Sequence, residues 1–192
     1  MRLFAARGFD HVTVAEVAAA AGVSEKTVFN YFPTKEDLFF DEVPRREAAL
    51  RDAIRNRAPG ETILGSLKRL QEEQCPRLCS PGFATFARII EDSPALKAKE
   101  LEIMAQFVQI LTQELTTELR LDSGDARIAA GLLVSVHRLL FHTARRQALD
   151  GKHGPAAVRR LRRDLNRAYF LLEHGLGELE RDSRNVAAVH TT

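Results

Sequence analysis

Two short helical patterns joined by one sharp turn constrain the N-terminal part of this chain more than any other feature. Thr13 and Glu16 have the spacing of a capping box, which predicts that a helix begins directly after Thr13. Gly22 predicts the end of that helix, because glycine adopts the left-handed conformation of a C-cap without strain. Ser24 is placed to cap a second helix. The pattern therefore predicts two packed helices within residues 14–32.

The second helix of this pair has an apolar face and a polar face. Val28 and Phe32 lie four residues apart and are expected to point inward, which leaves Lys26, Thr27, Asn30 and Tyr31 outward. The last three are spaced i, i+3, i+4, so their donors and acceptors can reach neighbouring base edges and phosphates in a major groove. An ordinary helical hairpin would show the same caps. The small alanines before the turn and the compact polar second helix favour a DNA-binding helix-turn-helix.

This region resembles the DNA-binding region of the TetR family of bacterial transcriptional regulators. The resemblance covers about the first quarter of the chain and rests on Gly8-Phe9-Asp10, Thr13-Val14, Ala21-Gly22-Val23-Ser24, Thr27-Val28-Phe29-Asn30-Tyr31-Phe32 and Lys35-Glu36, in the family's order and spacing. It implies a DNA surface formed by Thr13, Ser24, Lys26, Thr27, Asn30, Tyr31 and Lys35, with Lys35 donating to a phosphate from the start of a helix.

The chain departs from the family's pattern in two places. Phe29 stands where the family most often has a tyrosine, so one hydroxyl that could bind phosphate is absent. Residues 1–7 supply only the second half of the family's first helix. Either the true start lies upstream, or DNA binding is weakened.

The whole chain is expected to be all-α, with one small and one larger helical domain. Its 192 residues are 45% hydrophobic, enough for a sizeable core, and apolar residues recur at i, i+3, i+4 with little strict alternation. The expected domains are a DNA-binding domain at residues 1–43, a ligand-binding and dimerisation domain at 44–182, and a flexible tail at 183–192. Caps and breakers predict six helices after the helix-turn-helix, at 34–56 with a kink at Pro44, 61–74 ended near Pro76, 81–90, 94–121, 125–149 and 155–182.

The last of these helices carries an apolar stripe that is longer than one small domain needs. Its members recur at steps of three and four residues: Leu161, Leu165, Ala168, Leu172, Leu176 and Leu179. The family resemblance implies that the final two helices pair with those of a second copy, which forms a homodimer with two recognition helices about 34–36 Å apart. The alternative is that the stripe is core within one chain.

A small, mostly apolar effector is expected in the larger domain, because the resemblance implies a cavity among its middle helices. The candidate walls are Phe83, Phe86, Met104, Phe107 and Leu111, residue types that are more often plain core at this spacing.

Arg138 is the candidate anchor for the polar end of that effector. It lies in an apolar run, where a lone charge is costly to bury without an acid, water or a ligand anion, and His142 follows one turn later on the same face. Arg138 could instead pair with an acid at the dimer interface or reach solvent. A ligand anion would suit a fatty acid or an acyl-coenzyme A, which some members of the family bind.

Other classes of site lack their signatures in this sequence. The serines have no nucleophile-elbow context, no glycine loop is suited to phosphate, and His137 and His142 fall on different helical faces, so we expect no enzyme, metal or cofactor. Cys75 and Cys79 are expected to be reduced thiols, either buried or partly exposed, and a redox switch is the alternative. The sequence shows no signal peptide and no apolar run that would span a membrane, which predicts a cytoplasmic protein without a membrane partner.

The distribution of charge gives mixed support to DNA binding. Residues 1–43 contain four basic and seven acidic residues, a formal charge of −3, whereas a DNA-binding domain usually presents a basic surface. The strongest basic cluster lies far away and is expected to be a solvated helix face: Arg159, Arg160, Arg162, Arg163 and Arg167.

These observations predict a ligand-responsive, DNA-binding transcriptional regulator, most simply a repressor that its effector releases from an operator. The alternative is a small-molecule-binding or interaction module on the same scaffold, with weakened or lost DNA binding.

Overall fold

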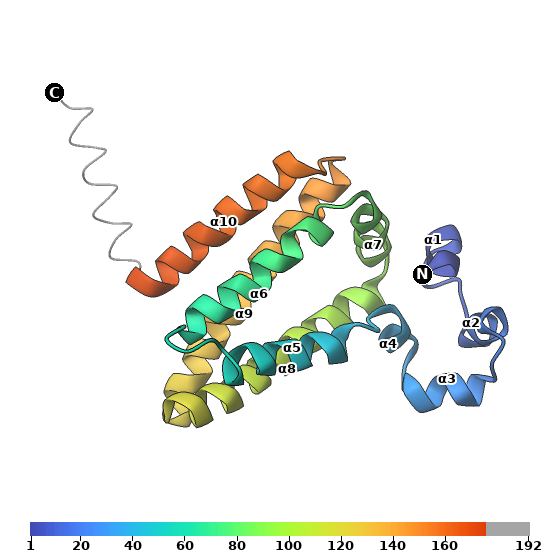
Figure 1. Ribbon diagram of the computed structural model, residues 1–192. Helices are drawn as coiled ribbons and strands as arrows, with labels where there is room; N and C mark the ends of the chain where they lie inside the picture. Colours follow the sequence, from blue (N-terminus) through green and yellow to red (C-terminus); the bar gives the residue numbers. More distant parts are fainter. Residues whose placement is uncertain (176–192) are drawn as a thin grey trace.

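The computed structural model describes residues 1–175, and this part of the chain is all-α, as predicted (Figure 1). Its helices are α1 (Arg2–Arg7), α2 (Val14–Ala21), α3 (Glu25–Tyr31), α4 (Lys35–Phe39), α5 (Val43–Arg55), α6 (Ile63–Leu78), α7 (Pro81–Asp92), α8 (Pro94–Leu119), α9 (Ser123–Leu149) and α10 (Pro155–His174). We call α1–α4 the head, α5–α10 the body, and residues 40–42 between them the junction. The predicted tail at 183–192 and the predicted end of the last helix near residue 182 lie outside the described residues.

The head is organised by the caps that the sequence predicted. Thr13 and Glu16 form a complete capping box at the start of α2, and Gly22 ends that helix in the left-handed conformation with φ 69°. The Ser24 hydroxyl accepts the backbone N–H of Thr27 at the start of α3. The predicted helix-turn-helix within residues 14–32 is therefore present.

The helix predicted at 34–56 is divided into α4 and α5, so the prediction of one kinked helix is wrong. Pro44 lies in the first turn of α5, where its missing N–H removes no bond within the helix. Pro44 therefore helps to begin a helix here. Pro76 does not end its helix as the sequence predicted, because α6 continues through it to Leu78.

The body packs around its two longest helices, α8 and α9, which run along each other. α5 lies against α6 and α8, α7 lies across α8 and α9, and α10 covers α6 and α9. One continuous hydrophobic core joins the body to the head, since Phe4, Phe9 and Phe39 of the head belong to the same cluster as the buried residues of α6 to α10. None of the described helices is long and apolar enough to cross a membrane.

The apolar stripe of α10 lies mostly inside the single chain. Leu161, Leu165 and Ala168 are 0%, 2% and 9% exposed, while Leu172 is half-buried and Leu176 and Leu179 lie outside the described residues. A buried side chain has no surface left to offer a second copy. The first three are therefore core residues, and their assignment to a dimer interface is corrected to the alternative that the stripe is core within one chain.

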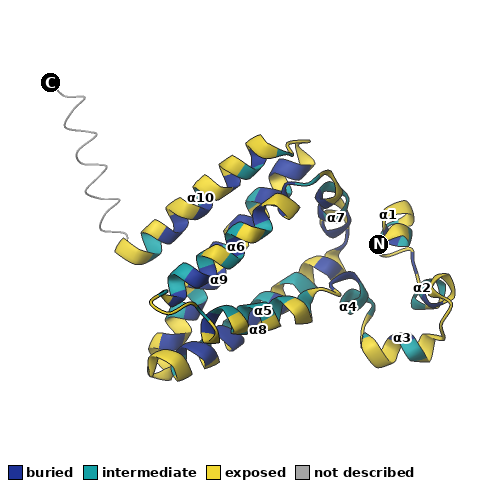
Figure 2. Ribbon diagram, viewed as in Figure 1, coloured by how far each residue is buried: buried dark blue, intermediate teal, exposed yellow. Residues whose placement is uncertain are grey.

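The predictions for the cysteines and for the arginine cluster agree with the described residues. Cys75 and Cys79 are buried, free thiols, and burial raises the pKa of Cys75 to about 11. The five arginines of α10 all lie on its exposed face, which is yellow in Figure 2, opposite the buried face that meets α6 and α9.

Candidate nucleic-acid interface and effector pockets

The polar face of α3 is turned to solvent at the outer edge of the head (Figure 2). Lys26, Asn30 and Tyr31 are exposed, and their side chains form no hydrogen bond or ion pair with the described part of the chain. Val28 on the opposite face is buried. These three side chains therefore point outward, as the sequence predicted, and their contacts with base edges and phosphates stay a prediction.

The predicted hydroxyl contacts are partly used inside the head. The Thr13 hydroxyl donates to Glu16 across 3.0 Å, and the hydroxyls of Ser24 and Thr27 share a hydrogen bond of 2.8 Å. One hydroxyl proton of the Ser24 and Thr27 pair remains for an outside acceptor. The local role of these residues is thus to fix the starts of α2 and α3.

Lys35 is directed inward in this structure, and its predicted phosphate contact has a competitor. Its ammonium donates to the carbonyl oxygens of Phe9 and Val12, at 3.0 and 3.1 Å, and lies 4.2 Å from the centre of the Phe9 ring. Two of its three N–H donors therefore hold the connection between α1 and α2.

Four of the seven acids in residues 1–43, those of the head and the junction, have internal partners. Arg7 pairs with Glu16 at 2.6 Å, and the backbone N–H of Thr13, followed by Arg7, lowers the pKa of Glu16 to about 2. Three other acids bind the body: Asp10 accepts the Ser93 hydroxyl, Asp37 pairs with Lys99 and Glu42 pairs with Arg77. Formal charge alone therefore overstates the repulsion between the head and a phosphate backbone.

The predicted effector residues are divided among three separate hollows. The junction pocket, of about 220 Å³, lies beside residues 40–42 and includes Phe83 and Phe86 together with Phe39, Phe40, Glu42, Arg46 and Arg77. The core pocket, of about 30 Å³, includes Phe107 and Leu111 together with Leu67, Gln71, Gln74, His137 and Arg46. The α8–α9 pocket, of about 110 Å³, brings together Met104, Arg138 and His142 with Glu100, Phe141 and Arg145.

Arg138 is exposed on α9 and reaches solvent. The expectation that its charge would be buried in the apolar run is therefore wrong. His142 is also exposed. Arg145 follows His142 by one helical turn and is the buried cation of this pocket. Its side chain is only 12% exposed and is paired with Glu100. Arg138 and His142 still line one pocket, and their role as an anchor remains a prediction.

Sequence reasoning missed Arg46, which lines both the junction pocket and the core pocket. Its guanidinium carbon lies 5.0 Å from the centre of the Phe141 ring, its Nη2 lies 3.6 Å from a Glu42 oxygen, and its Nε–H has no acceptor within the described chain. A signal was present in the sequence, because Arg46 shares a helical face with Leu50 and Ala53, which pack against the core. A cationic residue on the apolar face of an amphipathic helix indicates that its charged group lies inside the protein.

The core pocket also contains polar atoms without partners. Gln71 Oε1, Gln74 Oε1 and His137 Nε2 are buried and accept or donate no hydrogen bond within the described residues. Burial, followed by the charge of Arg46, lowers the pKa of His137 to about 4, so this imidazole is neutral near pH 7. The lining of the pocket contains no acid, so a cationic ligand would meet no counter-charge there.

Comparison with known proteins identifies the N-terminal region. Residues 1–41 match the model of the family described as bacterial regulatory proteins, tetR family. This region is therefore similar to the DNA-binding region of the tetR family. The match contains the whole capped unit from α1 to α4 and the exposed face of α3.

Two curated TetR-like relatives extend the similarity beyond the head. The HTH-type transcriptional regulator TcmR of Streptomyces glaucescens is 26% identical over 109 residues, which cover 53% of this chain and 48% of TcmR. The putative mycofactocin biosynthesis transcriptional regulator MftR of Mycobacterium tuberculosis (strain ATCC 25618 / H37Rv) is 26% identical over 124 residues, covering 59% of this chain and 58% of MftR. The matches thus span about half the length of these relatives.

A solved structure shares the fold over most of the chain. The fatty acid degradation regulator FadR from Bacillus halodurans matches with a TM-score of 0.52 and 22% identity, covering 91% of this chain and 94% of that one. The similarity shows that the two chains share a fold over most of their length.

Phe29 is the point at which the exposed side of α3 departs from the tyrosine expected from the family resemblance. Its ring is 46% exposed on α3, beside the polar face. It lacks the hydroxyl of the tyrosine usual in the family, but it offers an apolar surface of the kind that meets thymine methyl groups. The sequence showed only the missing hydroxyl.

Proposed function

We propose that this protein is a ligand-responsive transcriptional repressor that binds an operator as a homodimer and releases it when a small, largely apolar effector binds. The observation that carries the proposal is the free polar face of α3, on a capped helix-turn-helix that is packed into a body with internal pockets. No enzymatic step is part of the proposal.

The α3 residues divide into a base contact and backbone contacts. Asn30 carries an amide, the group that pairs with the N6 and N7 edge of adenine in the major groove. Lys26, with its charged ammonium, and Tyr31, with its phenolic donor, are suited to phosphates. Contacts to phosphates position the protein on DNA but carry no sequence information. Ser24 and Thr27 add the remaining hydroxyl donor beside the N-terminus of α3.

A second copy of the chain is the partner that the exposed face of α9 favours. Ile128, Leu132 and Leu139 are 65%, 54% and 51% exposed and lie along one stripe of this helix. A two-fold pairing through this stripe would bury it and set two recognition helices against one operator. We therefore propose the outer face of α9, with the adjoining face of α10, as the dimer interface.

A fatty acid or an acyl-coenzyme A fits the cations near the pockets, and FadR of Bacillus halodurans, which shares the fold, is a fatty acid degradation regulator. Arg138 and His142, with Met104, remain candidate contacts for the polar end of such a molecule. The rival function is a ligand-binding module with lost DNA binding, which the formal charge of the head favours.

A binding assay on DNA that flanks the native gene tests the proposal. The variant Asn30→Ala should lose about 1–3 kcal/mol of binding free energy on the cognate operator, while its binding to random DNA stays nearly unchanged. Asn166→Ala is the matched control, since Asn166 is an exposed asparagine of α10. Wild-type protein that binds none of this DNA even at low salt would favour the rival function, and equal losses on both DNAs would remove Asn30 from base contact.

A further inference from the structure

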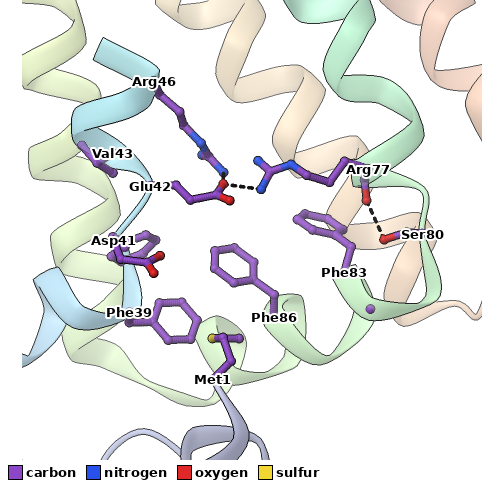
Figure 3. A pocket seen from close by; sticks show the side chains of 12 residues that line it. Met1, Phe39, Asp41, Glu42, Val43, Arg46, Arg77, Ser80, Phe83 and Phe86 are labelled. Atoms are coloured by element: carbon purple, nitrogen blue, oxygen red, sulfur yellow. Dashed lines mark hydrogen bonds and ion pairs between the residues drawn. The ribbon is translucent and has the colours of Figure 1, made fainter. Parts of the chain in front are cut away.

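A carboxylate of the protein itself lies between two arginines at the junction pocket. Figure 3 shows Glu42 pointing between Arg46 of α5 and Arg77 of α6, with one of its oxygens paired to both. The Arg46 contact is 3.6 Å, and the Arg77 contact is a direct hydrogen bond. The Glu42 side chain is 46% exposed, so it can turn out to water at little cost.

The space beside these charges has an aromatic lining. Phe39 and Phe86 stack with ring centres 4.8 Å apart at 13°, and Phe83 stacks on Phe86 at 5.7 Å. Figure 3 shows the rings of Phe86 and Phe39 further from the arginines, and the ring of Phe83 beside Arg77. The pocket is therefore amphipathic, because its lining combines two cations with apolar ring surfaces.

The cationic side has unused binding capacity. Arg46 uses only its Nη2 on Glu42, and its buried Nε–H lacks an acceptor within the described chain. Burial, followed by the nearby charge of Arg77, lowers the pKa of Arg46. Asp41 also lines the pocket and adds negative charge, but no ion pair joins it to either arginine. A planar carboxylate that reaches both guanidinium groups would be bound more completely than Glu42 is.

We propose that the junction pocket binds a small aliphatic or aromatic carboxylate, whose carboxyl group replaces Glu42 between Arg46 and Arg77 while its apolar part lies against Phe39, Phe83 and Phe86. Its volume of about 220 Å³ lies below the roughly 300–1,000 Å³ of pockets that hold drug-sized ligands, which suits a medium-chain or single-ring acid.

The position of Glu42 gives this binding a consequence. Glu42 is the residue directly before α5, in the break between α4 and α5, and its bond to Arg77 ties that break to α6. A ligand that takes Arg77 releases the tie and frees the junction to move, and the head with it. This inference rests on the proposed ligand response and names the chemistry and place of the effector.

Calorimetric titration of the full chain without DNA tests the site directly. The probes are octanoate and phenylacetate, with octanamide and phenylacetamide as uncharged controls. We expect both acids to bind with one molecule per chain and the amides to bind at least about tenfold more weakly, since a charge-assisted bond to arginine is lost. Arg77→Gln should weaken the acids by about tenfold or more, whereas Glu42→Gln, which removes the internal competitor, should tighten them about two- to fivefold.

Arg88→Gln is the matched control, because Arg88 is an exposed arginine of α7 outside the pocket lining, and it should bind as the wild type does. Acids and amides that bind equally, acids that do not bind, or an Arg77→Gln variant that binds as the wild type does would overturn the proposal. Loss of acid binding in Arg138→Gln but not in Arg77→Gln would overturn it in favour of the α8–α9 pocket. Because these titrations contain no DNA, failure of the acids to release an operator would count against the ligand response and leave the site itself standing.

Discussion

Replacing Lys35 by methionine should destabilise the head and leave the electrostatics of DNA binding unchanged. Methionine keeps the apolar stem of the side chain and removes the ammonium that binds the carbonyls of Phe9 and Val12. Those residues are 2% and 1% exposed, so water cannot easily replace the lost donors. The change therefore acts on the connection between α1 and α2.

The size of the effect follows from the contacts that are lost. A hydrogen bond with a charged donor contributes roughly 1.5–3 kcal/mol, and an exposed cation–π contact adds about 0.5–1 kcal/mol. Lys35 itself is partly exposed, so values near the lower ends apply. We expect Lys35→Met to lower the free energy of unfolding by about 2–4 kcal/mol.

Urea unfolding followed by circular dichroism measures this loss, and the salt dependence of DNA binding measures the alternative role. A lysine that neutralises one phosphate contributes about 0.9 to the slope of log K against log salt concentration. Lys26→Met is the control, because Lys26 is exposed on α3 and should lose slope while keeping stability. If Lys35→Met behaves like this control, with normal stability and a smaller slope, Lys35 is a phosphate ligand and our interpretation of its position is wrong.

Two further predictions follow from burial. Changing Leu132 and Leu139 together to lysine should give a folded monomer in sedimentation analysis. Leu165→Lys should instead unfold the protein, because Leu165 lies in the core of one chain. A double variant that stays dimeric would show that the interface lies elsewhere. Arg55→Ala should lower stability in urea unfolding more than Glu114→Gln does, because it takes from the buried Glu114 its two-bond partner and leaves only the 3.7 Å contact with Arg51, whereas Glu114→Gln leaves arginines that reach solvent; the reverse order would refute this account.

The parts of the fold that depend on neighbouring residues could be predicted from the sequence. Thr13 and Ser24 cap the helices expected of them, and Thr34 and Ser93 cap α4 and α8 in the same way, because a cap is decided by the hydroxyl and by backbone groups two or three residues away. The exposed face of α3 followed from the same local information, since Val28 fixes which side is inside.

The parts that depend on distant partners could not be predicted in this way. Helical periodicity showed that Leu161 and Leu165 would be buried, but not that α6 and α9 of the same chain would cover them. Arg138 lies in an apolar stretch of sequence, yet helical geometry carries it to the outer face of α9. Arg46 was missed because its importance arises only where α5 meets Phe141 and the junction.

The attachment of head to body combines weak polar ties with a strong aromatic contact. The ion pair between Asp37 and Lys99, like the one at Glu42, is partly exposed, and such pairs contribute roughly 0–1 kcal/mol each. The stacking of Phe39 of the head on Phe86 of the body contributes more free energy than these ion pairs. An aromatic side chain buries about 150–250 Å², and each Å² of buried apolar surface contributes about 25 cal/mol. The position of the head is therefore decided mainly where these rings meet. The same two rings line the junction pocket, so a molecule bound there changes both the polar tie and the aromatic contact that set the head against the body.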